Sequence, residues 1–458
     1  METSNYKGSD KLTLGIVLGV LTFWLFAQSL VNVAPAIQSD LGIPMESLNL
    51  AISLTALFSG CFIVVAGGLA DKLGRVKFTY IGFILSIIGS LLLILANGAV
   101  MFSIGRIIQG LSGACIMPAT LALMKTYFDG KERQRALSFW SIGSWGGSGV
   151  CSLAGGAIAT YMGWKWIFIF SIICALLGML LIKGTPESKV TDENQSKFDY
   201  SGLVTFVIAL VSLNLVITKG ASFGWTSAET LGLAALCAVA IITFFAIELK
   251  KKSASFIDFS LFKNKPYSGA AFSNFMLNAV AGTLIVANMY VQNGRNFTSF
   301  QSGMLSIGYL IAVLAMIRVG EKLLQKVGAK KPMIWGTLIT GTGVGLMALT
   351  FLPNTAYVAV VLIGYIFFGL GLGFYATPST DTAISNAPAD KVGVASGIYK
   401  MASSLGGAFG VAISASVYTA LLPSGTSVAA TVGLLVNVGF CILSFLAIVF
   451  MVPKNAGK

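Results

Sequence analysis

The chain has 458 residues, of which 56% are hydrophobic and only 10% are charged. Because soluble domains carry about a quarter charged residues, this composition excludes a soluble protein and predicts a polytopic membrane protein. The net charge of +13 does not indicate a nucleic-acid-binding protein, since most Lys and Arg residues fall in alternate loops between apolar runs. The sequence contains no histidine, so any proton chemistry has to use acids, basic partners or water.

About fourteen apolar runs are long enough to cross a bilayer as helices. They lie near residues 12–37, 47–70, 78–97, 99–124, 136–160, 164–183, 199–219, 226–249, 269–291, 299–320, 333–352, 355–378, 392–421 and 427–452. Loops rich in Lys and Arg alternate with loops poor in them, which predicts that the basic loops and both termini are cytoplasmic. We therefore expect an all-α, multi-pass protein of the cell membrane.

An internal repeat divides the chain into two halves. Pro-Ala-Thr at residues 118–120 recurs as Pro-Ser-Thr at residues 378–380. The repeat predicts an N-terminal six-helix bundle over 12–183 and a C-terminal six-helix bundle over 269–452, with a two-helix insertion at 199–249. Parallel repeats of this kind form a substrate site near the middle of the bilayer, around which the halves rock. Two fused halves make a monomer the natural expectation.

The loop after the second span carries glycines and charges at a distinctive spacing. Its members are Gly67, Asp71, Lys72, Gly74, Arg75 and Lys77. Asp71 is expected at a helix end that faces the basic loop 131–135, where Arg133 or Arg135 offers a partner. Such an ion pair would act as a conformational latch that holds two helices in one state and releases them in the other. The alternative is a plain turn with cytoplasmic basic residues.

The fourth span contains an arginine, followed by Gln109 and Gly110. Counting 1.5 Å per residue, Arg106 lies about 10 Å deep from the outer end of its helix. Such a charge is costly unless it is paired, and it would shift the proton affinity of a nearby acid. Its candidate partners are Gln28 and Asn32 on the first span and Glu46 in the first outer loop. Alternatively, Arg106 snorkels outward and only anchors the helix.

Two other acidic or cationic residues lie near the second-half spans. Asp381 follows the repeated Pro-Ser-Thr and is a candidate for proton coupling, or else a turn or cap residue at the cytoplasmic edge. Lys400 is a second cation at membrane depth.

The fifth span has small residues at regular intervals. The stripe includes Gly147, Cys151, Ser152, Gly155 and Gly156. Small residues let membrane helices approach closely, so the stripe predicts tight packing against another helix.

Several polar and aromatic residues are candidates for a substrate cavity. They are Trp24, Gln28, Asn32, Asn274, Asn278 and Tyr399. The alternative for these side chains is hydrogen bonding between helices. No GxxxxGK[ST] motif, metal-ligand cluster or nucleophile motif occurs in the sequence, so we expect neither an enzyme nor a cofactor or metal, and no direct use of ATP.

Three of these motifs resemble those of the major facilitator superfamily. GGLADKLGR at 67–75 resembles its loop motif, RIIQG at 106–110 its fourth-helix motif, and the stripe the antiporter signature of drug exporters. That signature has Gly-Pro where this chain has Cys151 and Ser152. The fourteen-span layout resembles the drug:proton antiporter branch with two extra helices. FWLFAQSLVNV (23–33) and YATPSTDTAISNAP (375–388) are similar to quinolone efflux pumps of the NorB/NorC type.

This resemblance implies the major facilitator fold and a proton-coupled exporter of amphiphilic drugs, including fluoroquinolones and cationic biocides. The proton gradient would be the energy source, and small drugs, protons and the bilayer the partners. Related exporters often carry an Asp in the first span, where this chain has AQSL (27–30) without an acid. The main alternative is a dedicated proton-coupled exporter of one native metabolite, lipid or siderophore. A receptor or enzyme on the same scaffold has no supporting feature.

Overall fold

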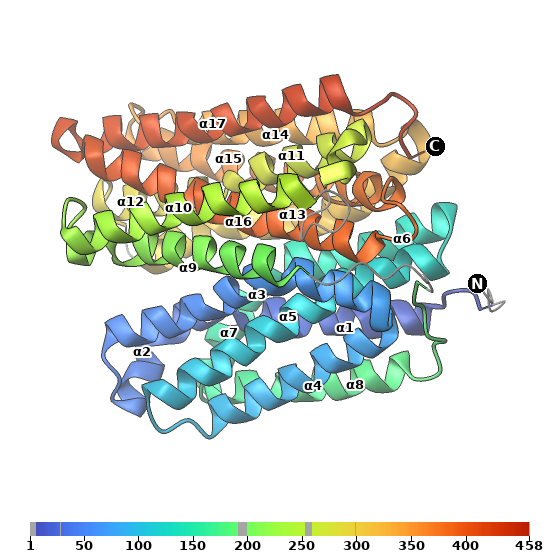
Figure 1. Cartoon of the computed structure of the whole chain (residues 1–458). Helices are drawn as coiled ribbons and strands as arrows, with labels where there is room; N and C mark the ends of the chain where they lie inside the picture. The colour runs from blue at the N-terminus through green and yellow to red at the C-terminus, as the bar shows by residue number, and fades with distance from the viewer. Residues whose placement is uncertain (1–5, 28, 191–198, 252–258, 298, 458) are drawn as a thin grey trace. The chain divides into compact units, whose positions relative to one another are not determined.

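The computed structural model describes residues 6–27, 29–190, 199–251, 259–297 and 299–457. Figure 1 shows a helical chain, and no strand occurs in these ranges. The first helices are α1 (Asp10–Ala27), α2 (Ser29–Leu41), α3 (Met45–Leu73), α4 (Arg75–Ile94), α5 (Ala99–Tyr127), α6 (Gly130–Ser141), the π-helical turn η1 (Ile142–Gly146), α7 (Gly147–Tyr161), α8 (Lys165–Ile182), α9 (Tyr200–Phe223) and α10 (Ala228–Lys251).

After α10 come η3 (Phe259–Lys263), α11 (Lys265–Ala279), α12 (Gly282–Asn293), α13 (Ser299–Val327), α14 (Lys330–Met347), α15 (Asn354–Ser385), α16 (Val392–Leu421), η4 (Leu422–Ser424) and α17 (Thr426–Met451). Both members of the sequence repeat lie inside long helices, Pro118 in α5 and Pro378 in α15.

Ten helices within the described ranges are long and apolar enough to cross a membrane. Large apolar side chains point outward on several of them, including Leu180, Ile242, Leu249 and Phe450. A helix with exposed apolar side chains is stable in lipid and not in water. The protein is therefore a multi-pass membrane protein, whereas the count of fourteen spans stays a prediction.

The described chain divides into two compact units. Unit 1 comprises residues 1–127, 151–263 and 388–398, and unit 2 comprises residues 128–150, 264–387 and 399–458. The first half of the fifth predicted span thus groups with the C-terminal helices, and the start of α16 groups with the N-terminal helices. These two units do not test the predicted division into two six-helix bundles and a two-helix insertion, which stays a prediction.

In unit 1, α5 packs against α3 and α4, while α8 packs against α1 and α4. The close approach of α3 and α5 depends on Gly110, where an added Cβ would lie 2.6 Å from the Thr55 carbonyl oxygen. The helices α9 and α10 pack on each other, and α9 also contacts α3. A buried apolar cluster that includes Leu30, Phe102 and Phe168 forms part of the core of this unit.

A capped helix start fixes the pair formed by α9 and α10. The Asp199 carboxylate accepts a hydrogen bond from Gly202 N at 2.8 Å, and Lys251 Nζ lies 2.5 Å from the same oxygen. Burial alone would raise the pKa of Asp199, but the Gly202 amide, the Ser201 hydroxyl and the Lys251 ammonium together hold it below its ordinary value.

In unit 2, α15 packs against α13 and α14, and α17 packs against α11, α12 and α14. The short helix α6 contacts both α13 and α15. Glycines on α16 meet the backbone of α11, since a Cβ on Gly406 would overlap the Phe275 carbonyl and one on Gly410 the Ala279 carbonyl. Small residues therefore set the helix spacing here, as expected for helices that pack in a membrane.

Candidate functional site

The first candidate site lies where α3 ends and α4 begins. Gly74 separates the two helices with a φ of 128°, a conformation that residues with a side chain rarely adopt. Across this break, Asp71 Oδ1 lies 2.8 Å from Arg75 Nη2 and accepts a hydrogen bond from Arg75 Nε at 2.9 Å. Asp71 and Arg75 are only 3% and 4% exposed, respectively. Buried charges are tolerated when they are paired and hydrogen-bonded, as these are.

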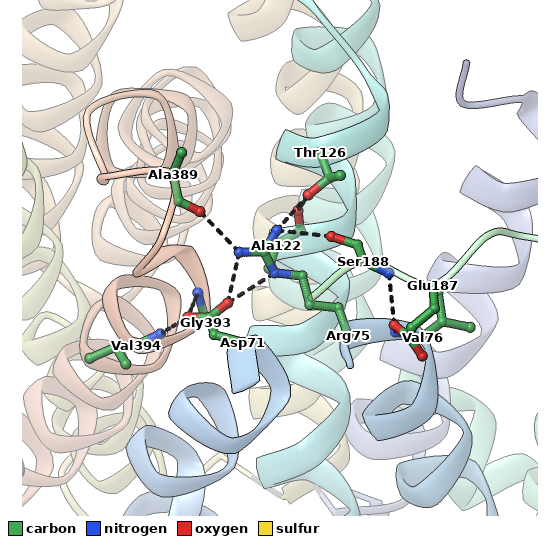
Figure 2. Close-up of polar contacts among 10 residues, drawn as sticks. All are labelled: Asp71, Arg75, Val76, Ala122, Thr126, Glu187, Ser188, Ala389, Gly393 and Val394. Carbon is green, nitrogen blue, oxygen red and sulfur yellow. Dashed lines mark hydrogen bonds and ion pairs between the residues drawn. The ribbon is translucent and has the colours of Figure 1, made fainter. Parts of the chain in front are cut away.

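The other carboxylate oxygen of Asp71 binds the start of α16, as Figure 2 shows. Gly393 N donates to Oδ2 at 2.7 Å and Val394 N at 3.2 Å. The first N–H groups of a helix lack partners within the helix, and the helix dipole favours a negative charge there. A Cβ on Gly67 would overlap the Gly393 carbonyl, so glycine is required for this close approach. We call Asp71, Arg75 and these two amides the Asp71 latch.

The guanidinium of Arg75 extends the latch to two further segments. Its Nη1 donates to Thr126 Oγ1 at 2.7 Å, and its Nη2 donates to the Ala389 carbonyl at 3.2 Å. Arg75 therefore contacts the end of α5 and the loop that leads into α16, in addition to Asp71. One buried side chain connects four segments of unit 1.

The predicted partner of Asp71 has a different role. Arg133 Nε donates to Asp381 Oδ1 at 3.1 Å within unit 2. The expected pairing of Asp71 with Arg133 or Arg135 stays a prediction. The helix α6, which carries Arg133, packs on α13 and α15 and so brings Arg133 to Asp381. Arg135 lies over the Phe139 ring, with its guanidinium carbon 5.9 Å from the ring centre. Lys72 and Lys77 are exposed, as expected for positively charged loop residues.

Asp381 is a fully buried residue in the last turns of α15, which continues to Ser385. The alternative interpretation as a turn or cap residue is therefore wrong. We call Asp381 and Arg133 the Asp381 pair. It joins α15 to α6 by side chains that are 248 positions apart in the sequence.

Arg106 is only 1% exposed and does not extend to the surface, which excludes the snorkelling alternative. Its Nη1 donates to Gln109 Oε1 at 2.8 Å, and its Nη2 donates to the Ile52 carbonyl at 3.0 Å on α3. Among the groups that the structure describes, none accepts a hydrogen bond from Arg106 Nε. Neutral oxygens thus hold the positive charge between α5 and α3.

The predicted partners of Arg106 lie outside this description. The structure does not describe Gln28, nor the side chains of Asn32 and Glu46. Their contact with Arg106 stays a prediction. Gln109 also donates to Ser90 Oγ at 3.5 Å, which connects the Arg106 site to α4.

Comparison with known proteins assigns the chain to a family of helical membrane transporters. The model of the Major Facilitator Superfamily matches residues 16–411. The chain belongs to the Major Facilitator Superfamily. Quinolone resistance protein NorB of Staphylococcus aureus (strain MRSA252) is 58% identical over 452 residues, which are 98% of this chain and 97% of that protein. NorB of strain Newman shows the same identity and coverage.

Two solved structures share the fold of this chain. The human organic anion transporter MFSD10 (TETRAN) has a TM-score of 0.67 at 13% identity, with 96% of this chain and 99% of that chain covered. The proton:xylose symporter XylE, bound to 6-bromo-6-deoxy-D-glucose, has a TM-score of 0.67 at 16% identity, with 98% and 96% covered. At such identities the likeness shows the major facilitator fold alone.

The antiporter-like stripe of this superfamily member lies on α7. A Cβ on Gly155 would lie 2.5 Å from Ser29 Cβ, so α7 meets the start of α2 at this point. Gly156 faces open space, and Gly147 is buried. The side chains of Cys151 and Ser152 lie outside the description. Close packing through the stripe is thus visible at one of its glycines.

Three of the predicted cavity residues lie in a buried polar network in unit 2. Asn274 Nδ2 donates to the Tyr399 carbonyl at 3.0 Å and to Ser403 Oγ at 2.7 Å, and Asn278 Nδ2 donates to Asn274 Oδ1 at 2.9 Å. The Tyr399 hydroxyl lies 2.9 Å from Ser379 Oγ. These contacts match the alternative of hydrogen bonding between helices. Trp24, by contrast, packs edge-on against Phe23 in unit 1.

Sequence reasoning missed several members of this network and of the latch. Ser273 lies 2.6 Å from the Tyr375 hydroxyl, which in turn accepts from Ser379 at 2.9 Å. Serine and tyrosine are common in membrane helices, so the residue type alone did not mark these positions as members of the network. Gly393 and Val394 act through backbone N–H groups, which every residue except proline has.

Lys400 is a buried cation on α16 and was expected at membrane depth. Its Nζ donates to Ser144 Oγ at 3.1 Å and lies 5.0 Å from the centre of the Trp140 ring. Ser144 belongs to the π-helical turn η1, a local distortion that often marks functional sites. Lys400 thus connects α16 to the fifth predicted span within unit 2.

Proposed function

We propose that the protein is a proton-coupled multidrug exporter that works by alternating access. The observation that carries the mechanism is the Asp71 latch, in which one carboxylate binds both Arg75 and the first amides of α16. The similarity to a quinolone resistance protein over nearly the whole chain supports the direction of transport and the substrates. We propose amphiphilic drugs, such as fluoroquinolones and cationic biocides, as those substrates.

The latch suits alternating access because its bonds are strong but few. The sequence repeat assigns α3 to the first half of the chain and α16 to the second half, so the Asp71 carboxylate connects the predicted halves. Charge-assisted hydrogen bonds are roughly twice as strong as neutral ones, and they require close geometry. The latch therefore stabilises the conformation in which α16 contacts Asp71. All of this stabilisation is lost when α16 moves away.

We propose that Arg106 and Asp381 couple protons to this movement. Arg106 places a buried positive charge between α3 and α5, where it lowers the proton affinity of any acid that approaches and repels cations. Asp381 is a buried acid whose pairing with Arg133 depends on its charge, so protonation weakens that contact. Glu46 stays a third candidate for the proton-binding acid.

We further propose that the transporter lies in the cell membrane with both termini in the cytoplasm, and that it acts as a monomer. The proton gradient would be the energy source, without a cofactor. The alternation of basic and non-basic loops supports this orientation.

Uptake into everted membrane vesicles tests this function. We expect a fluorescent cationic dye or a fluoroquinolone to accumulate when a pH gradient is imposed, and a protonophore to abolish accumulation. Arg106→Ala should abolish transport while the protein remains in the membrane, because the change removes the buried charge. Accumulation that ignores the protonophore would refute proton coupling, and transport confined to one native compound class would instead support a dedicated exporter.

A further inference from the structure

A short segment after α8 crosses the loop that holds the Asp71 latch. We call residues 186–190 the strap. The Tyr127 hydroxyl donates to the Pro186 carbonyl at 2.5 Å, and Val190 N donates to the Asp71 carbonyl at 2.8 Å. The strap is therefore fixed to the end of α5 on one side and to the end of α3 on the other. In the sequence, it leads from α8 towards α9.

Glu187 of the strap caps the first turn of α4. Its Oε1 accepts from Val76 N at 2.9 Å, and its Oε2 accepts from Lys77 N at 2.9 Å. Arg75 N donates to the Ser188 carbonyl at 2.9 Å, and Phe78 N closes the turn on the Gly74 carbonyl at 3.0 Å. All four N-terminal amides of α4 thus have acceptors. A carboxylate also interacts favourably with the dipole at a helix start.

Gly74 shows how closely the strap fits this turn. A Cβ at Gly74 would lie 2.5 Å from Glu187 Cδ and 2.6 Å from Glu187 Oε2. The positive φ of Gly74 is one reason for a glycine in the motif, and the carboxylate directly above it is a second. The motif glycine therefore makes room for an acid 113 positions later in the chain.

The strap also holds the side chain that pairs with Asp71. Arg75 Nη1 donates to Ser188 Oγ at 3.2 Å, next to its bond with Thr126 (Figure 2). The strap therefore fixes both the backbone and the guanidinium of Arg75. The bond between Asp71 Oδ1 and Arg75 then leaves Oδ2 directed at the amides of Gly393 and Val394.

We propose that Glu187 is a positioning residue for the Asp71 latch. It holds the first turn of α4, this turn holds Arg75, and Arg75 orients the carboxylate that caps α16. Two acids thus perform the same operation in sequence: Glu187 caps the second and third residues of α4, and Asp71 caps those of α16. The role in transport rests on the proposed function, whereas the effect on the latch does not.

Hydrogen–deuterium exchange of the whole protein in lipid nanodiscs tests this chain of contacts. A peptide that covers residues 74–78 reports the cap itself, and one that covers 391–397 reports the latch. In Glu187→Ala, we expect faster exchange in both peptides, by about threefold to tenfold at Gly393 and Val394, because both the charge and the two acceptors are lost. Glu187→Gln keeps one acceptor oxygen and should show a smaller change in both.

The exposed Glu132 in the first turn of α6 provides the matched control. Glu132→Gln should leave both peptides unchanged. If Glu187→Ala accelerates exchange at 74–78 but not at 391–397, then Glu187 is only a local cap and the proposal is wrong. Unchanged exchange in both peptides would also overturn it.

A double mutant shows whether the effect passes through Asp71. In an Asp71→Asn background, adding Glu187→Ala should not accelerate exchange at 391–397 any further, because the capping carboxylate is already lost. Additive acceleration would contradict the proposal. These measurements need neither a drug nor a proton gradient, so failure of the exporter hypothesis and failure of the strap hypothesis give different results.

Discussion

The Asp71 latch of unit 1 and the Asp381 pair of unit 2 use the same two side-chain types in different surroundings. Asp71 and Arg75 lie four residues apart, and Asp71 also accepts from two backbone amides. Asp381 and Arg133 lie on helices far apart in the sequence and meet through their side chains. The partner arginines also differ, since the Arg75 side chain is 5% exposed and the Arg133 side chain 17%.

This difference determines what happens when the acid loses its charge. Without Asp71, the guanidinium of Arg75 stays buried, and the amides of α16 lose a carboxylate. Without Asp381, Arg133 can turn towards water. Removing one partner of a buried pair costs about 3–5 kcal/mol because a charge is left uncompensated, and far less when that charge is solvated.

The largest effect is expected from Asp71→Asn. Transport of dye into everted vesicles should fall by about tenfold or more, since the variant leaves Arg75 buried without its counter-charge. Asp129→Asn, at the exposed start of α6, is the matched control and should transport normally. Equal transport by both variants at equal membrane levels would show that the latch has no role in the cycle.

A smaller loss, of about threefold to fivefold, is expected from Asp381→Asn, because the half-buried Arg133 regains water. The initial rate of dye uptake measures this loss, with Asp390→Asn in the exposed loop as the control. A lower initial rate of dye uptake in Asp381→Asn than in Asp71→Asn would contradict the expected difference between the two sites. If Asp381 couples protons, the variant should in addition respond less to the imposed pH gradient.

Exchanging the two residues distinguishes the sites further. The double variant Arg133→Asp with Asp381→Arg should recover to within about twofold of the wild-type rate, since opposite charges still meet. Asp71→Arg with Arg75→Asp should not recover, because a guanidinium cannot accept hydrogen bonds from the amides of α16. Recovery of both exchanges would mean that charge alone matters at each site.

The smallest effect concerns Gln325, a half-buried residue near the end of α13 in unit 2. Gln325 Nε2 donates to the Lys131 carbonyl at a long 3.5 Å near the start of α6. The contact with Lys131 is exposed and neutral, and the second one, with Glu321 Oε1 at 3.2 Å, stays within one helix, so Gln325→Ala should change uptake by less than about twofold. A loss as large as that of Asp71→Asn would show that unit 2 depends on an equivalent latch.

Sequence reasoning found the positions of the latch but not its partners. The spacing of Gly67, Asp71 and Gly74 predicted a latch at this loop, and burial of Arg106 was expected from its apolar surroundings. The pairing of Arg133 with Asp381 was not expected, because loop order says nothing about which helices α6 contacts. The amides of Gly393 and Val394 have no signature in residue type, so no inspection of the sequence identifies them.

The sequence by itself indicated the membrane environment, the all-helical class and the family. Hydropathy and helix length depend on neighbouring residues, and the spacing of a motif can be read directly along the sequence. Tertiary structure alone decided which oxygen meets which nitrogen: Asp71 with α16, Asp381 with Arg133, and Glu187 with α4. These contacts join residues more than 100 positions apart. Hydrogen bonds act over about 3 Å, so only the packing of the helices brings such groups together.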